Sequence, residues 1–476
     1  MLNMSEKSFN KYKNSNKAFP IFLKMNGDEL TPIAIYYRLK GKHKFLLESI
    51  YSENEIGRYS FIGAEPYMTI RSYGENIILS NDKGRREIKG KFLEYVQQYL
   101  TVDYDSAGLD VPFTGGAIGY VGYDIARQYE RLPFTKDDDL EVPEACLMFY
   151  KSFICYDHFK HEVYIVYNVV NDDHKDYSAV LNEINTLKNL IMSNVETHEL
   201  QQVQTHKELE SNVTKEKFCS LVDKAKEYIK AGDIFQVVLS QRLQLKNSSH
   251  PFDVYRRLRA KNPSPYLFYI DFDDMQMAGS SPESLVTVSG RKVTTNPIAG
   301  TRVRGKSLNE DLKLKKELLC DEKERAEHVM LVDLGRNDIG KVSKFGTVNI
   351  DKFMEVDFYS HVMHIVSKVS GDLNEGIGYL DALKACLPVG TVSGAPKIRA
   401  MEIIDELEET KRGVYAGAIG YFSFSGNMDT CIGIRTILFK KNYAYVQAGA
   451  GIVYDSVPEN EYMETLNKAM AMREVI

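Results

Sequence analysis

Two acidic pairs at helical spacing are the residues of this chain with the clearest capacity for chemistry. Glu324 and Glu327 stand in "DEKERAEH", and Glu461 and Glu464 stand in "PENEYMET". Residues three positions apart share one face of a helix, so each segment can aim two carboxylates at one point. Two such faces meeting would form an all-oxygen site suited to Mg²⁺, because this ion keeps several waters and needs few carboxylates. Two solvated helix faces are the alternative, since acidic side chains are mostly exposed.

A single arginine in an apolar run is the next candidate. Arg435 lies in "CIGIRTIL", where a buried guanidinium would be costly unless an anion satisfies it. Strand alternation could equally turn this side chain to solvent. Close by, "QAGAG" offers Gly449 and Gly451, whose bare backbone lets N–H groups approach a carboxylate, although bulge glycines would look the same.

A histidine and a glycine-containing loop complete these candidates. His364 in "HVMHIVSKVSG" could titrate near neutrality, although a single histidine in an apolar strand is more often structural. The stretch "TTNPIAGTR", residues 294–302, resembles a strand that ends at a site, yet its centre is the unreactive Ala299. The common nucleotide-binding motifs are not matched. "GAGIVY" lacks the third glycine of a dinucleotide-binding loop, and "GTVSGAPK" is one residue short of a phosphate-binding loop. Neither a Gly-x-Ser-x-Gly elbow nor a cysteine elbow suited to glutamine hydrolysis occurs.

The elements that must position these residues indicate an α+β fold. The segment "EKFCSLVDKAKEYIKAGD" predicts an amphipathic helix that ends near Gly232, and a strand "IFQVVLSQRLQL" follows at once. The last third is predicted as an antiparallel meander of "GAIGYFSFS", "TCIGIRTILF" and "YAYVQAGAGIVY". "GAIGY" also occurs at 116–120, which would fit two related halves or chance. Strands in runs, with helices set apart, favour α+β over a doubly wound parallel sheet.

Length and charge narrow the class of protein. The 476 residues suffice for two or three average domains, and the polar stretch 194–214 predicts a boundary between residues 1–205 and 206–476. A net charge of −6 without a long basic block argues against nucleic acid as a partner.

No apolar run approaches the ~18 residues of a membrane span, and the first residues lack the apolar region of a signal peptide. We therefore expect a cytoplasmic protein that binds no membrane. The six cysteines form no Cys-x-x-Cys pair, which disfavours a zinc site or a disulfide framework.

Taken together, these segments resemble the chorismate-utilising enzymes, most closely the branch of anthranilate synthase large subunits. The resemblance spans most of the chain and rests on the order and number of its motifs. These motifs are "LLES" at 46–49, "GDIFQVVLSQR" at 232–242, "NPSPYLFY" at 262–269, "SSPES" at 280–284, "PIAGTRVRG" at 297–305, "DEKERAEHVMLVDLGRND" at 321–338, "HVMHIVS" at 361–367, "PVGTVSGAPKIRAMEII" at 388–404, "RGVYAGAIGY" at 412–421, "DTCIGIRT" at 429–436 and "QAGAGIVYDSVPENEYMET" at 447–465.

The resemblance implies a fold and a metal site. Members of the family have two large β-sheets stacked into a sandwich and wrapped by helices, with the active site in the C-terminal part. Matched by motif, Glu327 and Glu464 resemble direct Mg²⁺ ligands, and Glu324 and Glu461 resemble holders of metal-bound waters. The metal would serve as a template and charge neutraliser for the substrate.

The resemblance also implies groups that bind chorismate. Those implied for its ring carboxylate are Gly300, Thr301, Gly449, Ala450 and Gly451. Tyr415 and Arg435 resemble the clamp on the enolpyruvyl carboxylate, which would supply the anion that the arginine needs.

The implied reaction adds ammonia at C2 of the ring while the C4 hydroxyl leaves, and then eliminates pyruvate to give anthranilate. Hydroxide is a poor leaving group, so a carboxylic acid must protonate it. Glu283 of "SSPES" resembles that general acid, and its site would have to raise its pKa. His364 resembles the residue implicated in the elimination, and Thr301 is expected to act beside it.

Two uncharged positions indicate the nucleophile. Related enzymes that make isochorismate or salicylate carry a lysine where Gln236 stands, and one common type of aminodeoxychorismate synthase carries a nucleophilic lysine where Ala299 stands. Free ammonia is therefore the expected attacking group. An aminodeoxychorismate synthase without the loop lysine is one alternative. A non-catalytic chorismate or amino-acid sensor on the same fold is the other, weakened because the catalytic candidates are all present.

Two partners follow from the resemblance. Because the chain has no glutaminase cysteine elbow, a separate glutamine amidotransferase subunit is expected to dock and to channel ammonia into the site. L-Tryptophan is the expected feedback inhibitor. Its pocket is implied to consist of Leu47, Glu48, Ser49, Pro265, Tyr266 and Tyr421.

Overall fold

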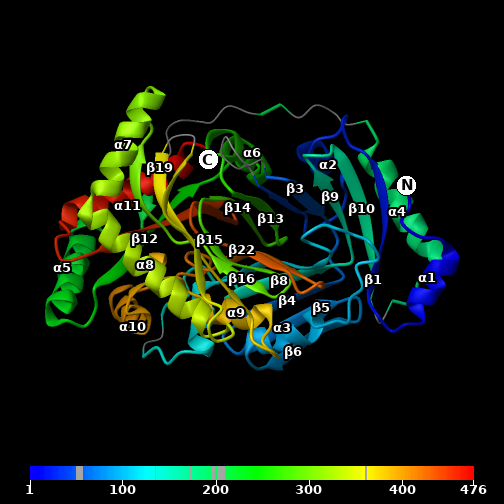
Figure 1. Ribbon diagram of the computed structural model, residues 1–476, viewed down its shortest axis with the longest axis horizontal. Coiled ribbons are helices and arrows are strands. Elements are labelled where there is room, and N and C mark those ends of the chain that lie inside the picture. Colours follow the sequence, from blue (N-terminus) through cyan, green and yellow to red (C-terminus); the bar gives the residue numbers. More distant parts are fainter. Residues whose placement is uncertain (50–56, 134–135, 171–172, 195–198, 201–208, 360–361) are drawn as a thin grey trace.

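The computed structural model describes residues 1–476 except 50–56, 134–135, 171–172, 195–198, 201–208 and 360–361. The predicted boundary between residues 205 and 206, and most of the polar stretch around it, lie outside the described residues. Within the described part, the strands form two sheets of 12 strands each. Helices flank these sheets, which run through the centre of the molecule (Figure 1).

The first sheet joins N-terminal strands at one end to C-terminal strands at the other, through the pair β2–β13. Its order is β1 (Phe19–Asn26), β10 (Glu162–Val169), β9 (Ser152–Asp157), β3 (Tyr59–Gly63), β2 (Phe45–Glu48), β13 (Tyr266–Asp271), β14 (Met275–Ser281), β23 (Thr436–Lys440), β24 (Tyr443–Ile452), β12 (Gln236–Lys246) and β11 (Glu210–Ser211), with β20 (Gly394–Ala395) beside β12.

The second sheet has the same mixed origin and is joined through the pair β21–β7. Its order is β17 (Ile298–Val303), β19 (Val362–Asp372), β16 (Lys292–Thr295), β15 (Ser284–Ser289), β22 (Met428–Ile432), β21 (Ala418–Ser423), β7 (Gly116–Val121), β8 (Ala145–Tyr150), β4 (Met68–Tyr73), β5 (Asn76–Asn81) and β6 (Gly84–Lys89), with β18 (Asn349–Phe358) beside β19. Both sheets therefore continue from the N-terminal into the C-terminal half of the chain.

The helices lie outside the sheets. They are α1 (Glu6–Lys13), α2 (Pro32–Arg38), α3 (Phe92–Leu100), α4 (Tyr177–Ile191), α5 (Lys215–Ala231), α6 (Pro251–Lys261), α7 (Leu308–Cys320), α8 (Glu322–Gly340), α9 (Tyr379–Cys386), α10 (Lys397–Leu407) and α11 (Pro458–Arg473), with the 3₁₀ turns η1 (Tyr123–Gln128) and η2 (Gly390–Val392). The predicted helix after residue 215 is confirmed as α5, which ends at Gly232 in the left-handed conformation, φ +83°. The strand predicted to follow is β12.

Alternation along β7 shows where the core lies. Ile118 and Tyr120 belong to the cluster between the sheets, which also contains Phe268 of the first sheet. Ala117 and Val121, one position away, belong to the cluster beneath helices on the outer face. Period-2 alternation thus buries both faces of this strand, as a sandwich covered by helices requires. The predicted α+β sandwich is confirmed.

The C-terminal meander was predicted wrongly in one respect. "TCIGIRTILF" is not a single strand, because β22 belongs to the second sheet and β23 to the first. The chain crosses between them at residues 433–435, where Arg435 has φ +49°. Gly433 is needed at this crossing, because a Cβ there would lie 2.2 Å from the carbonyl oxygen of Val414. Arg435 therefore sits in a connection between sheets, and strand alternation does not govern its direction.

The repeated "GAIGY" segments lie side by side. β7 and β21 pair antiparallel with Gly119 opposite Gly420, and Ile118 opposite Tyr421. The first segment thus pairs with the second across the middle of the sheet.

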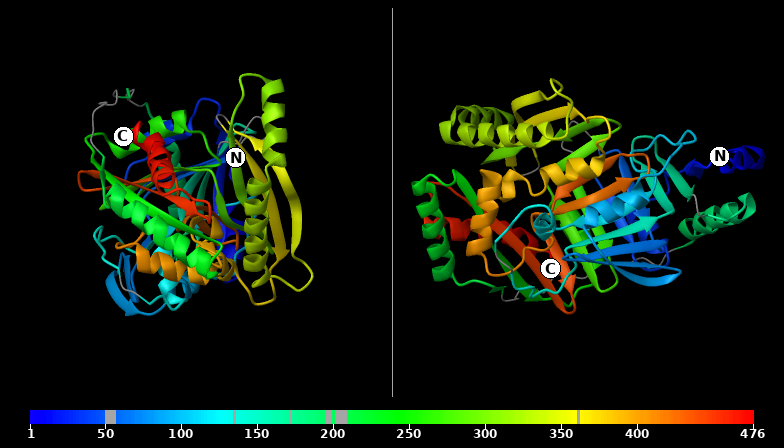
Figure 2. Two further views of the ribbon diagram at one scale, coloured as in Figure 1. Left: turned by 90° about the vertical axis from the view of Figure 1, so that its left-hand side faces the viewer. Right: turned by 90° about the horizontal axis from the view of Figure 1, so that it is seen from below.

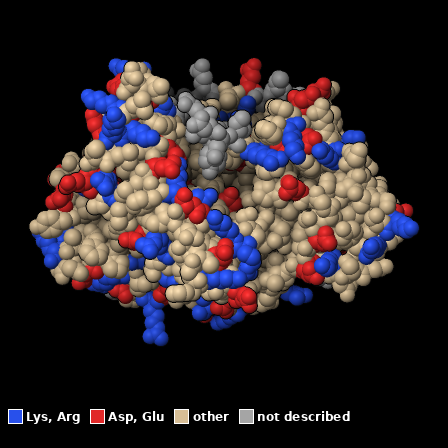
Figure 3. Space-filling view, viewed as in Figure 1, with Lys and Arg blue, Asp and Glu red and all other residues tan. Residues whose placement is uncertain are grey.

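Three further features concern the surface. α7 and α8 stand against the strands β17, β18 and β19 as one side of the molecule (Figure 2). Figure 3 shows acidic and basic side chains interspersed on the viewed face, around a central hollow. No helix among the described residues is long and apolar enough to cross a membrane.

Candidate active site

A cavity of about 270 Å³ brings together most of the predicted catalytic and substrate-binding residues. The predicted residues that line it are Gln236, Glu283, Ala299, Thr301, Glu327, His364, Tyr415, Arg435, Gly449 and Gly451. They come from strands of both sheets, from α8, from the β14–β15 connection, from the turn before β21 and from the crossing after β22. The remaining candidates for this site, Gly300, Ala450, Glu324, Glu461 and Glu464, lie outside its lining.

Arg435 presents a half-buried cation to this cavity. Its Nη1 donates a hydrogen bond of 2.7 Å to the carbonyl oxygen of Lys468, and no carboxylate among the described residues forms an ion pair with it. Burial lowers the pKa of Arg435 below its usual value. A guanidinium in this situation is stabilised by an anion that enters the cavity.

The glycines of "QAGAG" allow two polar side chains to approach β24. A Cβ at Gly449 would lie 2.6 Å from the Tyr415 hydroxyl, and one at Gly451 would lie 2.5 Å from Gln236 Nε2. Any larger residue would therefore displace Tyr415 or Gln236 from the cavity wall. The methyl group of Ala450, in contrast, is fully buried in the hydrophobic core. Only its backbone is left to serve the binding role predicted for it.

A bulge in β17 positions His364. Ala299 pairs with Ile365 and Thr301 with His364, which leaves Gly300 as the extra residue, in the left-handed region at φ +66°. His364 Nδ1 lies 3.0 Å from the Gly300 carbonyl oxygen and 3.1 Å from Thr301 Oγ1. Since a carbonyl only accepts, Nδ1 carries the proton and Nε2 keeps its lone pair. Burial lowers the pKa of His364, which favours this neutral form.

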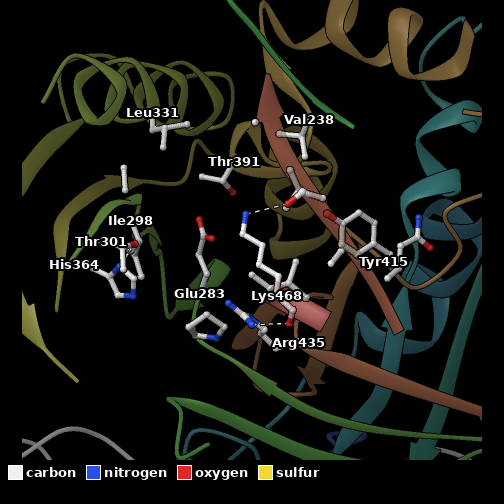
Figure 4. A pocket seen from close by; sticks show the side chains of 18 of the residues that line it. Val238, Glu283, Ile298, Thr301, Leu331, His364, Thr391, Tyr415, Arg435 and Lys468 are labelled. Carbon is white, nitrogen blue, oxygen red and sulfur yellow. Dashed lines mark hydrogen bonds between the residues drawn. The ribbon is translucent and has the colours of Figure 1, made fainter. Parts of the chain in front are cut away.

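Glu283 has the properties that a general acid needs. It lies between β14 and β15 and is enclosed except where it faces cavities. Burial raises the pKa of this carboxyl group to about 8, against the opposing effects of the Thr391 hydroxyl and the Lys468 ammonium. Figure 4 shows Glu283 between the Thr301–His364 pair on one side and Lys468 on the other. Near neutral pH the group therefore holds a proton that it can give to a bound molecule.

The four predicted metal ligands lie on α8 and α11. Burial, and then the neighbouring Glu324 and Glu464, raise the pKa of Glu327. The pKa of Glu461 is raised by its burial and by Glu464. Carboxylates that raise one another's pKa are a donor set that a divalent cation stabilises.

These carboxylates are engaged by protein groups in this structure. Glu324 accepts a hydrogen bond of 3.1 Å from Arg302, Glu327 one of 3.3 Å from Gln236, and Glu464 pairs with Lys468 at 2.7 Å. In the described part of the chain, no three His, Cys, Asp or Glu side chains are gathered closely enough to hold a metal ion. The donor set fits Mg²⁺ in its chemistry, and binding would require these side chains to exchange partners.

Sequence reasoning missed two residues of the cavity. Lys468 lines it and donates to the Gly449 carbonyl oxygen at 3.0 Å. The signal was available, since Lys468 follows Glu464 by four positions on α11 and i,i+4 pairs of opposite charge share a helix face. Thr391 lines the cavity from η2. It belongs to "PVGTVSGAPKIRAMEII", which supports the family resemblance but gave no role to this threonine.

A separate cavity of about 180 Å³ gathers all six residues predicted for the tryptophan pocket, Leu47, Glu48, Ser49, Pro265, Tyr266 and Tyr421. β2 and β13 supply one wall and β21 another. None of the described residues lines both this cavity and the active-site cavity.

Two carboxylates have different roles at this second cavity. Glu48 is held by the Tyr255 hydroxyl at 2.6 Å and Arg259 Nε at 2.7 Å, so it ties β2 to α6. Asp429 accepts a hydrogen bond of 3.0 Å from the Tyr266 hydroxyl, and burial raises its pKa to about 6. Asp429 was not among the predicted residues.

Comparison with known proteins shows the family of the chain. The sequence profile of the chorismate binding enzyme family matches residues 42–474. Anthranilate synthase component 1 of Acetivibrio thermocellus is 49% identical over 469 residues, which cover 96% of this chain and 95% of that protein. The protein of the same name from Lactococcus lactis is 46% identical, with 95% of this chain and 98% of the relative covered.

Solved structures of similar proteins indicate the same family and fold. Anthranilate synthase component I from Streptococcus pneumoniae is 42% identical and superposes with a TM-score of 0.81, covering 94% of this chain and 98% of that one. The menaquinone-specific isochorismate synthase from Escherichia coli shares the fold, with a TM-score of 0.73 at 17% identity. The chain belongs to the chorismate binding enzymes and, within them, to the family of anthranilate synthase component 1.

Proposed function

We propose that the chain converts chorismate and ammonia into anthranilate and pyruvate, the first committed step of tryptophan synthesis. The observation that carries this proposal is one cavity lined by an acid, a neutral histidine and a half-buried arginine that forms no ion pair among the described residues. Chorismate carries two carboxylates, an enolpyruvyl ether and a hydroxyl leaving group, and each of these features has a matching group there.

Binding rests on the positive charges of the cavity. Arg435 would hold the enolpyruvyl carboxylate, with the Tyr415 hydroxyl beside it. The ring carboxylate would meet Thr301 and the β24 backbone at Gly449 and Gly451. When bound by Glu327 and Glu464, with Glu324 and Glu461 around them, Mg²⁺ would neutralise this carboxylate and orient the ring.

Proton transfer falls to Glu283 and His364. Glu283, protonated near neutral pH, would give its proton to the C4 oxygen as ammonia bonds to C2, so that water leaves instead of hydroxide. His364 would then take the C2 proton on Nε2 as the C3–O bond breaks and the ring becomes aromatic, and it would return that proton to the departing enolpyruvate, which leaves as pyruvate. Its Nδ1 bond to the Gly300 carbonyl oxygen holds the ring in the required tautomer.

The nucleophile is proposed to be ammonia because the two positions at which related enzymes carry a lysine, Gln236 and Ala299, are uncharged here. Ala299 contributes a methyl group where a lysine could attack the ring. Gln236 contributes a neutral amide, and its buried Oε1 has no hydrogen-bond partner in the described part of the protein. This oxygen would accept an N–H of the incoming ammonia and so direct its lone pair to the ring.

An assay of the purified chain tests the proposal. Chorismate, Mg²⁺ and an ammonium salt at alkaline pH should give anthranilate, followed by its fluorescence. Accumulation of 4-amino-4-deoxychorismate or isochorismate would contradict the proposal and favour another reaction of the family. No turnover, with chorismate bound, would favour a sensor.

The ammonia would come from a partner. We propose a glutamine amidotransferase subunit that docks on this chain, and with that subunit present glutamine should replace the ammonium salt in the same assay.

The Mg²⁺ assignment predicts a specific loss in Glu464→Ala. Removing one donor of a small carboxylate set should raise the Mg²⁺ concentration needed for half-maximal activity at least about tenfold. The measurement is a Mg²⁺ titration of anthranilate formation. Glu459→Ala, on the exposed first turn of the same helix, is the matched control and should titrate like the wild type. An unchanged titration in Glu464→Ala would remove this residue from the metal site.

The second cavity is proposed to bind L-tryptophan as a feedback inhibitor. Ser49→Phe should fill part of its 180 Å³ and raise the inhibitory tryptophan concentration at least about tenfold, while turnover stays near that of the wild type. Inhibition curves of anthranilate formation measure this. Ser49→Ala, which adds no bulk, is the control that should stay inhibited. Retained inhibition in Ser49→Phe would place the inhibitor elsewhere.

A further inference from the structure

A small cavity lies behind Glu283, on the side away from the substrate. It measures about 30 Å³ and shares Glu283, Leu331 and Thr391 with the active-site cavity. Its remaining walls come from α8, from the segment 386–390 and from the end of β16 and the loop after it, and include Ser284 at the start of β15. Figure 4 shows the Glu283 carboxyl group pointing toward Thr391. We call this space the rear cavity.

The hydroxyl group of Ser284 indicates what the rear cavity holds. Ser284 is only 6% exposed, and its Oγ has no hydrogen-bond partner among the residues that the structure describes. Buried polar groups that lack a protein partner are commonly satisfied by ordered water, which needs two to four polar neighbours. The volume suffices for about two water molecules, and the Glu283 carboxyl and the Ser284 hydroxyl are both at its wall.

An ion pair separates the rear cavity from a larger one. Asp338 lines the rear cavity and pairs with Lys397, whose side chain is 10% exposed. Lys341 donates to the same carboxylate at 3.2 Å, and its side chain is 51% exposed. Both lysines line a third cavity of about 360 Å³, whose wall includes the exposed Glu130 and Lys384. A charged contact thus connects the rear cavity to solvent.

One face of α8 runs past all of these features. Glu327 faces the active-site cavity, Leu331 lies between the two cavities, and Gly335 and Asp338 line the rear cavity. The spacings of four, four and three residues keep these positions on one stripe of the helix. The arrangement leads from the reacting carboxyl group to the surface without passing through the substrate.

Glu283 needs such a route, because it gives up its proton in every turnover while the substrate fills its front side. We propose that the rear cavity holds ordered water that returns a proton to Glu283, with Ser284 as a positioning residue and the Asp338–Lys397 pair as the link to solvent. This inference rests on the proposed role of Glu283 as the general acid.

The protons balance over one turnover. Glu283 transfers its proton to the C4 oxygen, the C4–O bond breaks and water leaves. The rear water then protonates the Glu283 carboxylate and regains a proton from solvent past Asp338. The ammonium group formed when ammonia bonds to C2 releases one proton to solvent, so none is consumed overall.

Two variants of the full chain test this route. Ser284→Ala removes a hydroxyl that has no protein partner, so its melting temperature should not fall. Gly335→Ala places a methyl group at the wall of the rear cavity, 3.1 Å from Thr295 Cγ2, and takes up space there. In both we expect kcat for anthranilate formation about tenfold lower, KM for chorismate and for ammonia unchanged, and a larger solvent deuterium isotope effect on kcat.

Ser343→Ala is the matched control, because this buried hydroxyl also lacks a partner in the described residues but lines neither cavity. It should leave all of these values unchanged. If kcat and the isotope effect of Ser284→Ala and Gly335→Ala equal those of the wild type, the inference is wrong. A rise in KM for ammonia with unchanged kcat would also contradict it, since the cavity would then carry ammonia. Anthranilate formation by the wild type in the same assay tests the proposed function separately.

Discussion

Replacing Glu283 by glutamine should lower kcat for anthranilate formation at least about 100-fold, the contribution typical of a positioned general acid. The amide has nearly the same shape but cannot supply the proton that turns the C4 hydroxyl into water. Because the carboxyl group is already neutral near pH 7, the substitution changes no charge in the ground state. Chorismate KM and Mg²⁺ dependence should therefore stay close to those of the wild type, and they serve as the control.

The pH dependence of the wild type provides the second half of this test. Glu283 acts in its protonated form, and burial raises its pKa to about 8, so activity at a fixed concentration of free ammonia should fall as the pH rises through about 8. His364 acts in its neutral form with a pKa below its usual value, so the acid limb should lie below pH 6.5. Glu283→Gln should lose the alkaline limb and keep the acid limb. A glutamine variant with wild-type kcat and an unchanged profile would assign the acid to another group.

Glu283 and His364 show which properties of the site the sequence can predict and which it cannot. Their motifs predict the roles of Glu283 and His364, but neither pKa direction can be read from a motif. The values depend on which groups enclose each side chain, and those come from β17, β24, η2 and α11, far apart along the chain. The second cavity could not be derived from local sequence patterns either. Its walls are β2, β13 and β21, and these strands come together only because of the order in which strands pair in the two sheets.

The sequence around Arg435 explains why a single strand was predicted where the chain crosses between the two sheets. "CIGIRTIL" is rich in apolar and β-branched residues on both sides of the arginine, as a strand would be. Nothing in that pattern says that the chain changes sheets. The break is caused by the close approach of Gly433 to the Val414 carbonyl oxygen and by the left-handed conformation of Arg435, which are tertiary contacts. The predicted metal ligands remain a prediction: their spacing places them on two helices, but the spacing could not show that Glu324 is bonded to Arg302 and Glu464 paired with Lys468 in this structure.

The position of Arg435 leads to a prediction in which function and stability move in opposite directions. Arg435→Met keeps an unbranched side chain of similar apolar volume and removes the charged guanidinium group. The binding partner of a buried charge typically loses about 2 kcal/mol or more when that charge is removed, so kcat/KM for chorismate should fall at least about 30-fold. Most of the loss should appear at low chorismate concentration, because the ground state and the transition state both carry the enolpyruvyl carboxylate.

The melting temperature of the same variant should equal or exceed that of the wild type. In the protein without substrate, the guanidinium is half-buried with a single hydrogen bond to the Lys468 carbonyl oxygen and no ion pair in the described residues, which is a desolvation cost that methionine does not carry. Arg325→Met, at an exposed position of α8, is the control for loss of charge alone and should leave both values unchanged. A lower melting temperature in Arg435→Met, with kcat/KM reduced in proportion to the folded fraction, would make this arginine a structural residue. A stable variant that no longer binds chorismate would show that the fold tolerates an unpaired cation at the crossing between its sheets because the substrate is the partner.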